Sequence, residues 1–188
     1  MVKFNYKKEH IDLLVSDAKA GNIKALEELL KRVQKDIYSM FYHLIDSKND
    51  VSDLTQETLL KIAKGIKNLN DIKNFKAWVN QIITNIFYDY AKKNKNIIVE
   101  INEEKFNEIK DKLGCEPGEK CLFAELEKLI RAALLTLPKD LRITLILREY
   151  EGLSYSDISK ITNTALGTVK SRLSRARLKL QNELKDFI

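Results

Sequence analysis

Cysteine is almost absent from this sequence, which holds two in 188 residues, Cys115 and Cys121. Two thiols five residues apart cannot form the disulfide framework of a small secreted domain. A structural zinc site usually takes four nitrogen or sulfur ligands, and no histidine lies near this pair. The sequence therefore predicts no metal ion and no other cofactor.

Long apolar runs are also missing. No stretch approaches the roughly 20 apolar residues that span a bilayer, and the first residues do not resemble a signal peptide. We therefore expect a cytoplasmic protein with no integral membrane segment. Alternating strand patterns are equally scarce, because only Ile97, Ile98 and Val99 form a strand-like piece, and it is too short to build a sheet.

Helical periodicity fills most of the remaining sequence. Apolar residues recur at three- and four-residue spacing from Ile11 to Ile45, with a break at Gly21, and again from Ser52 to Leu69 and from Phe75 to Tyr90. Asp46 to Asp50 is expected to form a polar turn. Gly65 lies inside the second helical pattern and costs up to about 1 kcal/mol relative to alanine, yet we expect the helix to continue through it. Further helices are expected from Cys121 to Leu135, with Leu126 facing inward, and from Pro138 onward.

Charge is distributed unevenly along the chain. The formal net charge is +6, yet residues 97–127 hold nine acidic residues against four lysines. Gly114 and the Pro117-Gly118 pair fall in the same acidic segment and favour a linker. We predict an all-α fold of two small helical domains, residues 1–95 and 121–188, joined by a flexible acidic linker at 96–120.

The most informative stretch runs from Leu153 to Leu180. Ser154 stands three residues before Asp157, as in a helix N-cap, and Thr162-Asn163-Thr164 predicts a turn, with Gly167 as a flexible joint. A second helix follows, whose apolar stripe is Val169, Leu173, Ala176 and Leu180. Its other faces are basic and carry no acid between Thr168 and Lys179. A short capped helix, a turn and a basic amphipathic helix are typical of a DNA-binding helix-turn-helix.

A solvated basic surface or a membrane-surface helix is the alternative interpretation of this stretch. The capped helix and turn before it argue against both. A membrane helix would also favour Trp or Phe at its apolar edge, where this helix has Val, Leu and Ala.

Three motifs together resemble the extracytoplasmic-function sigma factors. Residues 137–142 (LPKDLR), 153–158 (LSYSDI) and 167–177 (GTVKSRLSRAR) resemble region 4 of that family. Residues 50–58 (DVSDLTQET) resemble region 2.2, and Phe75 to Val79 with Asn85, Asp89 and Tyr90 resemble regions 2.3 and 2.4. The resemblance covers nearly the whole chain in the family's order. It implies a subunit of bacterial RNA polymerase that recognises a promoter through two domains and helps to open the DNA.

Carried over by position, the resemblance assigns DNA contacts to two helices. The minus-35 element would be bound by Thr168, Lys170, Ser171, Arg172, Ser174, Arg175 and Arg177, with Thr168, Arg172 and Arg177 nearer the DNA backbone. The minus-10 element would be bound by Asn85, Asp89, Lys92 and Lys93. The two lysines have a second explanation, since cations also stabilise a helix C-terminus. Phe75 and Trp78 could stack on bases, although helical spacing favours Trp78 as a core residue.

The resemblance also implies partners. Asp53, Gln56 and Glu57 would bind the basic β′ coiled coil of core RNA polymerase, because an acidic helix face suits a cationic partner. A solvated acidic face is the alternative. Promoter DNA and an anti-sigma factor are the other partners that the family implies.

Two other classes of protein remain to be weighed. A helix-turn-helix repressor or activator would bind duplex DNA alone and carry a sensing domain, for which the N-terminal half shows no pattern. An enzyme acting on nucleic acid would need a metal-binding carboxylate cluster or an activated nucleophile. The sequence shows neither feature. We therefore predict that the protein is not an enzyme.

Overall fold

The computed structural model describes residues 10–94 and 119–185, with side chains described from residue 126 onward in the second range. Within these ranges the regular structure is helical and no strand occurs. The chain forms two compact units, one of Met1–Tyr42 with Ser47–Phe87 and the other of His43–Asp46 with Tyr88–Ile188. Residues 96–118 of the predicted linker, Cys115 among them, lie outside the described residues, as does the side chain of Cys121. The last two residues of the predicted linker, 119 and 120, are helical.

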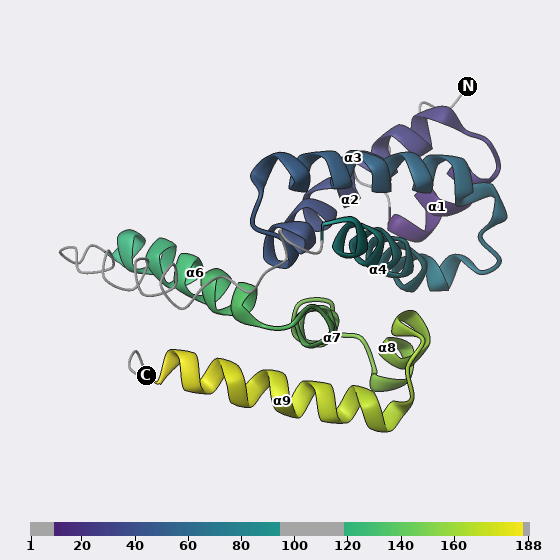
Figure 1. Ribbon diagram of the computed structural model, residues 1–188. Helices are drawn as coiled ribbons and strands as arrows, with labels where there is room; N and C mark the ends of the chain where they lie inside the picture. Colours follow the sequence, from purple (N-terminus) through teal and green to yellow (C-terminus); the bar gives the residue numbers. More distant parts are fainter. Residues whose placement is uncertain (1–9, 95–118, 186–188) are drawn as a thin grey trace. The chain divides into compact units, whose positions relative to one another are not determined.

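The first unit contains helices α1 (Ile11–Lys19) and α3 (Lys48–Gly65) and most of α2 (Ile23–Leu44) and α4 (Phe75–Lys93) (Figure 1). The last residues of α2, from His43, and of α4, from Tyr88, belong to the second unit. Two short 3-10 turns, η2 (Ile66–Asn68) and η3 (Ile72–Asn74), connect α3 to α4 and both contact α1. The core of the unit is apolar and includes Leu14, Val15, Leu29, Ile37, Phe41, Ile62, Ile83 and Phe87. The helical periodicity of the sequence predicted this set.

Helix α3 begins earlier than the sequence indicated. Ser47 occupies the N-cap, and its hydroxyl accepts a hydrogen bond from the Asp50 amide at 3.3 Å. Residues 48–50 are therefore the first turn of α3, and the predicted polar turn is shorter than expected. A serine cap satisfies an amide that the helix itself leaves without a partner.

Gly65, the last residue of α3, lies against the indole of Trp78. A Cβ at this position would stand 2.9 Å from Cζ2 of Trp78. The Trp78 ring also lies near Phe75, at 6.1 Å between ring centroids. The α-helix expected to continue through Gly65 ends at this residue, directly before η2. The absent side chain permits close packing of the tryptophan.

The second unit is built from α6 (Glu119–Thr136), α7 (Lys139–Glu149), α8 (Tyr155–Thr162) and α9 (Leu166–Leu184). Helix α9 contacts the other three, and Figure 1 shows its N-terminal end beside α8 and its C-terminal half running along α6. Leu180 and Leu184 pack on Leu129, Ala132 and Ala133 of α6. Leu126 is 47% exposed, so its predicted inward position is wrong, because it lies one turn beyond this contact.

Arg142 of α7 is buried and fixes the corner between α6 and α7. Its guanidinium donates hydrogen bonds to the carbonyl oxygens of Leu135 at 2.7 Å, Leu137 at 2.8 Å and Leu44 at 2.6 Å. The last carbonyl groups of a helix have no partner within the helix. A buried arginine with several donors supplies that partner and explains the residue at this position.

Candidate nucleic-acid interface

The helix-turn-helix begins with the predicted cap. Ser154 Oγ accepts from the Asp157 amide at 3.1 Å and donates to the Asp157 carboxylate at 2.6 Å. Helix α8 then ends at Asn163, which adopts the left-handed conformation with φ of 50°. Asparagine tolerates this conformation better than most residues.

The turn itself is held by hydroxyl groups. Ser159 Oγ donates to the Thr164 carbonyl at 2.6 Å, and the hydroxyls of Thr162 and Thr164 lie 2.9 Å apart. Gly167, predicted as the joint, is instead the second residue of α9, whose N-cap is Ala165. The chain therefore bends at Asn163. The turn predicted from Thr162-Asn163-Thr164 is confirmed, and the joint predicted at Gly167 is wrong.

The apolar stripe of α9 is buried at Val169, Leu173 and Ala176, as predicted. The opposite side is exposed at Lys170, Ser171, Ser174 and Arg175, which recur at helical spacing on one face. Arg175 Nε makes only a long contact, 3.3 Å, to the carbonyl of Ser171 in its own helix. This face presents two cations and two hydroxyls, groups that can donate to base edges in a major groove.

The remaining three predicted minus-35 residues lie off the centre of that face. Thr168 is half-buried. Arg177 pairs with Glu149, the last residue of α7, at 2.6 Å between Nη2 and Oε1. Hydrogen bonding to this carboxylate, and then to Tyr155, raises the pKa of Arg177.

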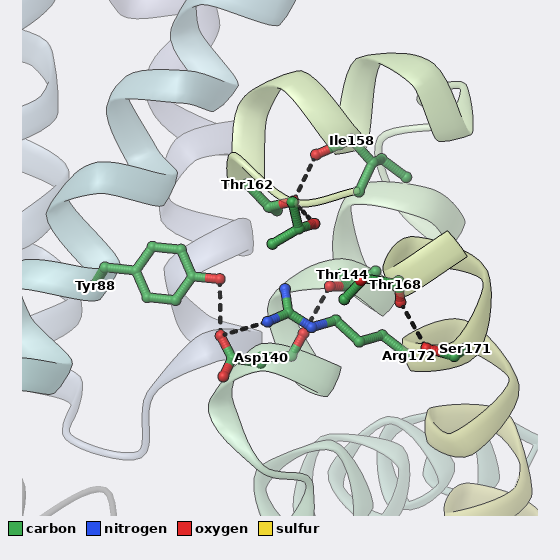
Figure 2. Close-up of polar contacts among 9 residues, drawn as sticks. Tyr88, Asp140, Thr144, Ile158, Thr162, Thr168, Ser171 and Arg172 are labelled. Atoms are coloured by element: carbon green, nitrogen blue, oxygen red, sulfur yellow. Dashed lines mark hydrogen bonds and ion pairs between the residues drawn. The ribbon is translucent and has the colours of Figure 1, made fainter. Parts of the chain in front are cut away.

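Arg172 is also engaged within the second unit. Its Nη2 lies 3.5 Å from Oδ1 of Asp140, in the first turn of α7. Figure 2 shows that the same carboxylate accepts a hydrogen bond from the Tyr88 hydroxyl, at 3.0 Å. Burial, followed by the charge of Asp140, raises the pKa of Tyr88 well above its usual range.

The predicted minus-10 residues share one face of α4. Asn85, Asp89, Lys92 and Lys93 are all exposed and lie at positions i, i+4, i+7 and i+8. Gln81, one turn earlier, donates to Asn85 Oδ1 at 3.0 Å and orients that amide. Gln81 was missed in the sequence, although its spacing of four residues from Asn85 would have indicated it.

Phe75 is 5% exposed and is therefore a core residue of the first unit. Trp78 is half-buried between Gly65 and Phe75. Both positions fit the core interpretation better than base stacking, because a stacking ring must offer one open face.

The predicted polymerase-binding residues occupy the exposed side of α3. Asp53, Gln56 and Glu57 are exposed, and Glu57 pairs with Lys61 at 3.0 Å. Leu60 continues the same face and is 59% exposed. Leu60 was not among the predicted residues, although its position seven residues after Asp53 places it on this face by helical geometry.

Within the described residues, no group of three or more His, Cys, Asp and Glu side chains is placed to hold a metal ion. Across the same residues, no helix combines the length and apolar character that crossing a bilayer requires. The candidate functional surfaces of the described residues are therefore exposed helix faces. The regular structure of the described residues is helical and includes a C-terminal helix-turn-helix with an exposed basic face on α9, the arrangement of a DNA-binding transcription factor.

Comparison with known proteins gives the family. Residues 29–97 match Sigma-70 region 2, and residues 127–180 match Sigma-70, region 4. The ECF RNA polymerase sigma-E factor of Haemophilus influenzae is 31% identical over 183 residues, covering 93% of this chain and 95% of that protein. Its counterpart in Escherichia coli K12 is 29% identical and covers 94% of this chain and 95% of that protein. The chain belongs to the ECF RNA polymerase sigma factors, the transcription initiation factors that direct RNA polymerase to promoters.

Solved structures of two other proteins have a similar fold. The sigma factor RpoE from Bartonella quintana, in complex with the anti-sigma factor NepR, has a TM-score of 0.65 at 29% identity, with 87% of this chain and 98% of that chain covered. CnrH, in complex with the cytosolic domain of CnrY, shares the fold at a TM-score of 0.65 and 19% identity, with 93% and 97% covered. The predicted all-α fold is confirmed.

Proposed function

We propose that this sigma factor divides its work among three helix faces. Helix α9 reads the minus-35 element, α4 meets the minus-10 element, and the exposed side of α3 binds the β′ coiled coil of core RNA polymerase. The domains would be residues 1–95 and 121–188, with 96–120 as the linker. The observation that carries the proposal is that the predicted contact residues of α4 and of α3, and Lys170, Ser171, Ser174 and Arg175 of α9, each share an exposed face of their helix.

At the minus-35 element, Lys170, Ser171, Ser174 and Arg175 would contact bases. Arginine and lysine donate to O6 and N7 of guanine, while serine adapts to several bases. Thr168 and Arg177 flank this set and would lie nearer phosphates, which position a helix without reading sequence.

At the minus-10 element, Asn85 would bind a base that has left the stack, because an amide both donates and accepts hydrogen bonds. Asp89 lies one turn further along the same face. Lys92 and Lys93, exposed at the end of α4, would lie along phosphates. Their second role, stabilising the helix C-terminus, is compatible with this contact.

The α3 face combines acids with one exposed leucine. Asp53 and Glu57 would attract a basic partner, which accelerates association and favours the correct orientation. Leu60 would supply apolar area at the centre of the interface, where binding energy usually concentrates.

The remaining roles follow from the family. We propose that the chain has no catalytic activity of its own, acts in the cytoplasm, and is restrained by an anti-sigma factor. The solved relatives RpoE and CnrH are each in complex with a partner protein, which supports that restraint.

Charge reversal on α3 tests the polymerase-binding face. We expect Asp53→Lys with Glu57→Lys to abolish association with core polymerase, because lysines would face a basic coiled coil. The matched control is Glu27→Lys with Asp36→Lys, which makes the same charge change at exposed positions of α2. Co-purification with core polymerase is the measurement, and circular dichroism confirms folding. Equal binding by both double variants would refute the assignment.

A further inference from the structure

Two arginines of α9 pair with acidic residues at opposite ends of α7. Asp140 in its first turn holds Arg172, and Glu149 at its end holds Arg177. The two pairs differ in exposure. The Arg172 side chain is 15% exposed, whereas that of Arg177 is 50% exposed.

The guanidinium of Arg172 points inward. Its Nη1 is buried and makes no hydrogen bond within the described part of the chain. The carboxylate of Asp140 that it faces is shared with the Tyr88 hydroxyl (Figure 2). Drawing Arg172 out to a phosphate would leave that carboxylate without its cation, and breaking one side of a partly buried pair is unfavourable.

Arg177 has no such constraint. Both side chains of its pair with Glu149 are exposed to water. Exposed ion pairs are weak because water and salt screen them. A phosphate can therefore replace Glu149 at little cost.

We propose that Arg172 is a positioning residue that sets the rotation of α9 on α7 through Asp140, and that Arg177 is the arginine that contacts a DNA phosphate. Ser171 and Arg175 neighbour Arg172 on the helix, so a rotation of α9 redirects the groups that read bases. This inference rests on the proposed binding of α9 to the minus-35 element.

The experiment uses holoenzyme made from the full chain and core polymerase, on a promoter selected from a randomised library. Dissociation constants are measured on that promoter and on one with a scrambled minus-35 element, between about 50 and 200 mM salt. The pair of Arg172 with Asp140 is the inner pair, and the pair of Arg177 with Glu149 is the outer pair. Arg172→Met and Asp140→Asn test the inner pair. Arg177→Met and Glu149→Gln are the matched variants of the outer pair.

For the inner pair we expect each single variant to lose about tenfold in preference for the intact minus-35 element. The double variant should lose no more than either, since both break one interaction. The salt dependence should stay that of the wild type. For the outer pair, Arg177→Met should weaken binding to both promoters alike and reduce the slope of log K against log salt by about 0.9, as for one lost phosphate contact. Glu149→Gln should tighten binding to both.

A reduced salt slope for Arg172→Met, tighter binding by Asp140→Asn, or no change in either variant would overturn the inference. Should Arg172→Met fail to fold by circular dichroism, Asp140→Asn decides alone, because it keeps the arginine and an amide of the same shape. A wild-type holoenzyme that ignores the minus-35 element would refute the DNA-binding role of α9 before any substitution is made. Failure of the proposed function is thus distinguished from failure of the pair assignment.

Discussion

At the scale of the residue, Arg175 differs from Arg172 and Arg177, the other two arginines of α9. Among the described residues it forms no ion pair, and its side chain is exposed on the same face as Ser171 and Ser174. Arg172 and Arg177 look equivalent in the sequence, since both are arginines in a basic run. Their separation into an inner and an outer pair depends on Asp140 and Glu149, which lie in another helix and cannot be matched to them by sequence spacing.

We expect Arg175→Ala to weaken binding of the holoenzyme to its preferred minus-35 sequence by about 1–3 kcal/mol, as the loss of a bidentate base contact does. Arg175→Lys is the control, because it keeps the charge and removes the planar fork that donates two parallel hydrogen bonds. Selectivity should fall in both variants, and titration against matched and mismatched promoters measures it. An equal loss on every sequence would reduce Arg175 to a phosphate contact.

At the scale of the element, helix periods predicted where α1, α2, α4 and α9 lie and which of their faces are buried. Polar residues near helix ends predicted the positions of the helix boundaries less accurately. Ser47 starts α3 several residues before the predicted Ser52, because either serine can serve as a cap and tertiary packing selects between them. At the turn before α9, Asn163 bends the chain and Gly167 does not. A glycine permits an unusual conformation without requiring it.

Gly65 shows how packing overrides helix propensity. Replacing glycine by alanine within a helix usually stabilises by up to about 1 kcal/mol, but here the new methyl would stand 2.9 Å from Trp78. We expect Gly65→Ala to lower the free energy of unfolding by about 1–2 kcal/mol, because overpacking a close contact displaces the ring. Urea denaturation followed by the fluorescence of Trp78, the single tryptophan, measures this directly.

The matched control is Gly167→Ala in α9, where a Cβ would meet nothing within 4 Å. That substitution should leave stability unchanged or raise it by up to about 1 kcal/mol. If both alanine variants were equally stable, Trp78 would not be constrained by Gly65.

At the scale of the whole molecule, the function needs faces that are separated in the sequence. The family resemblance predicted those faces from Asp53 to Arg177, and their exposure is consistent with it. Gln81 and Leu60 extend two of them by one helical turn, which the sequence could have indicated. The role of Arg142 could not be predicted, because a buried arginine is recognisable only once the carbonyl groups around it are placed.

Promoter-dependent transcription by purified components is the most direct test of the central claim. Core polymerase is supplied with or without this chain on a library of promoter fragments, and transcript start sites are mapped. We predict initiation at a defined set of promoters that share minus-35 and minus-10 elements, only when the chain is present. Sequence-specific DNA binding by the chain alone, with no effect on initiation by core polymerase, would contradict the account.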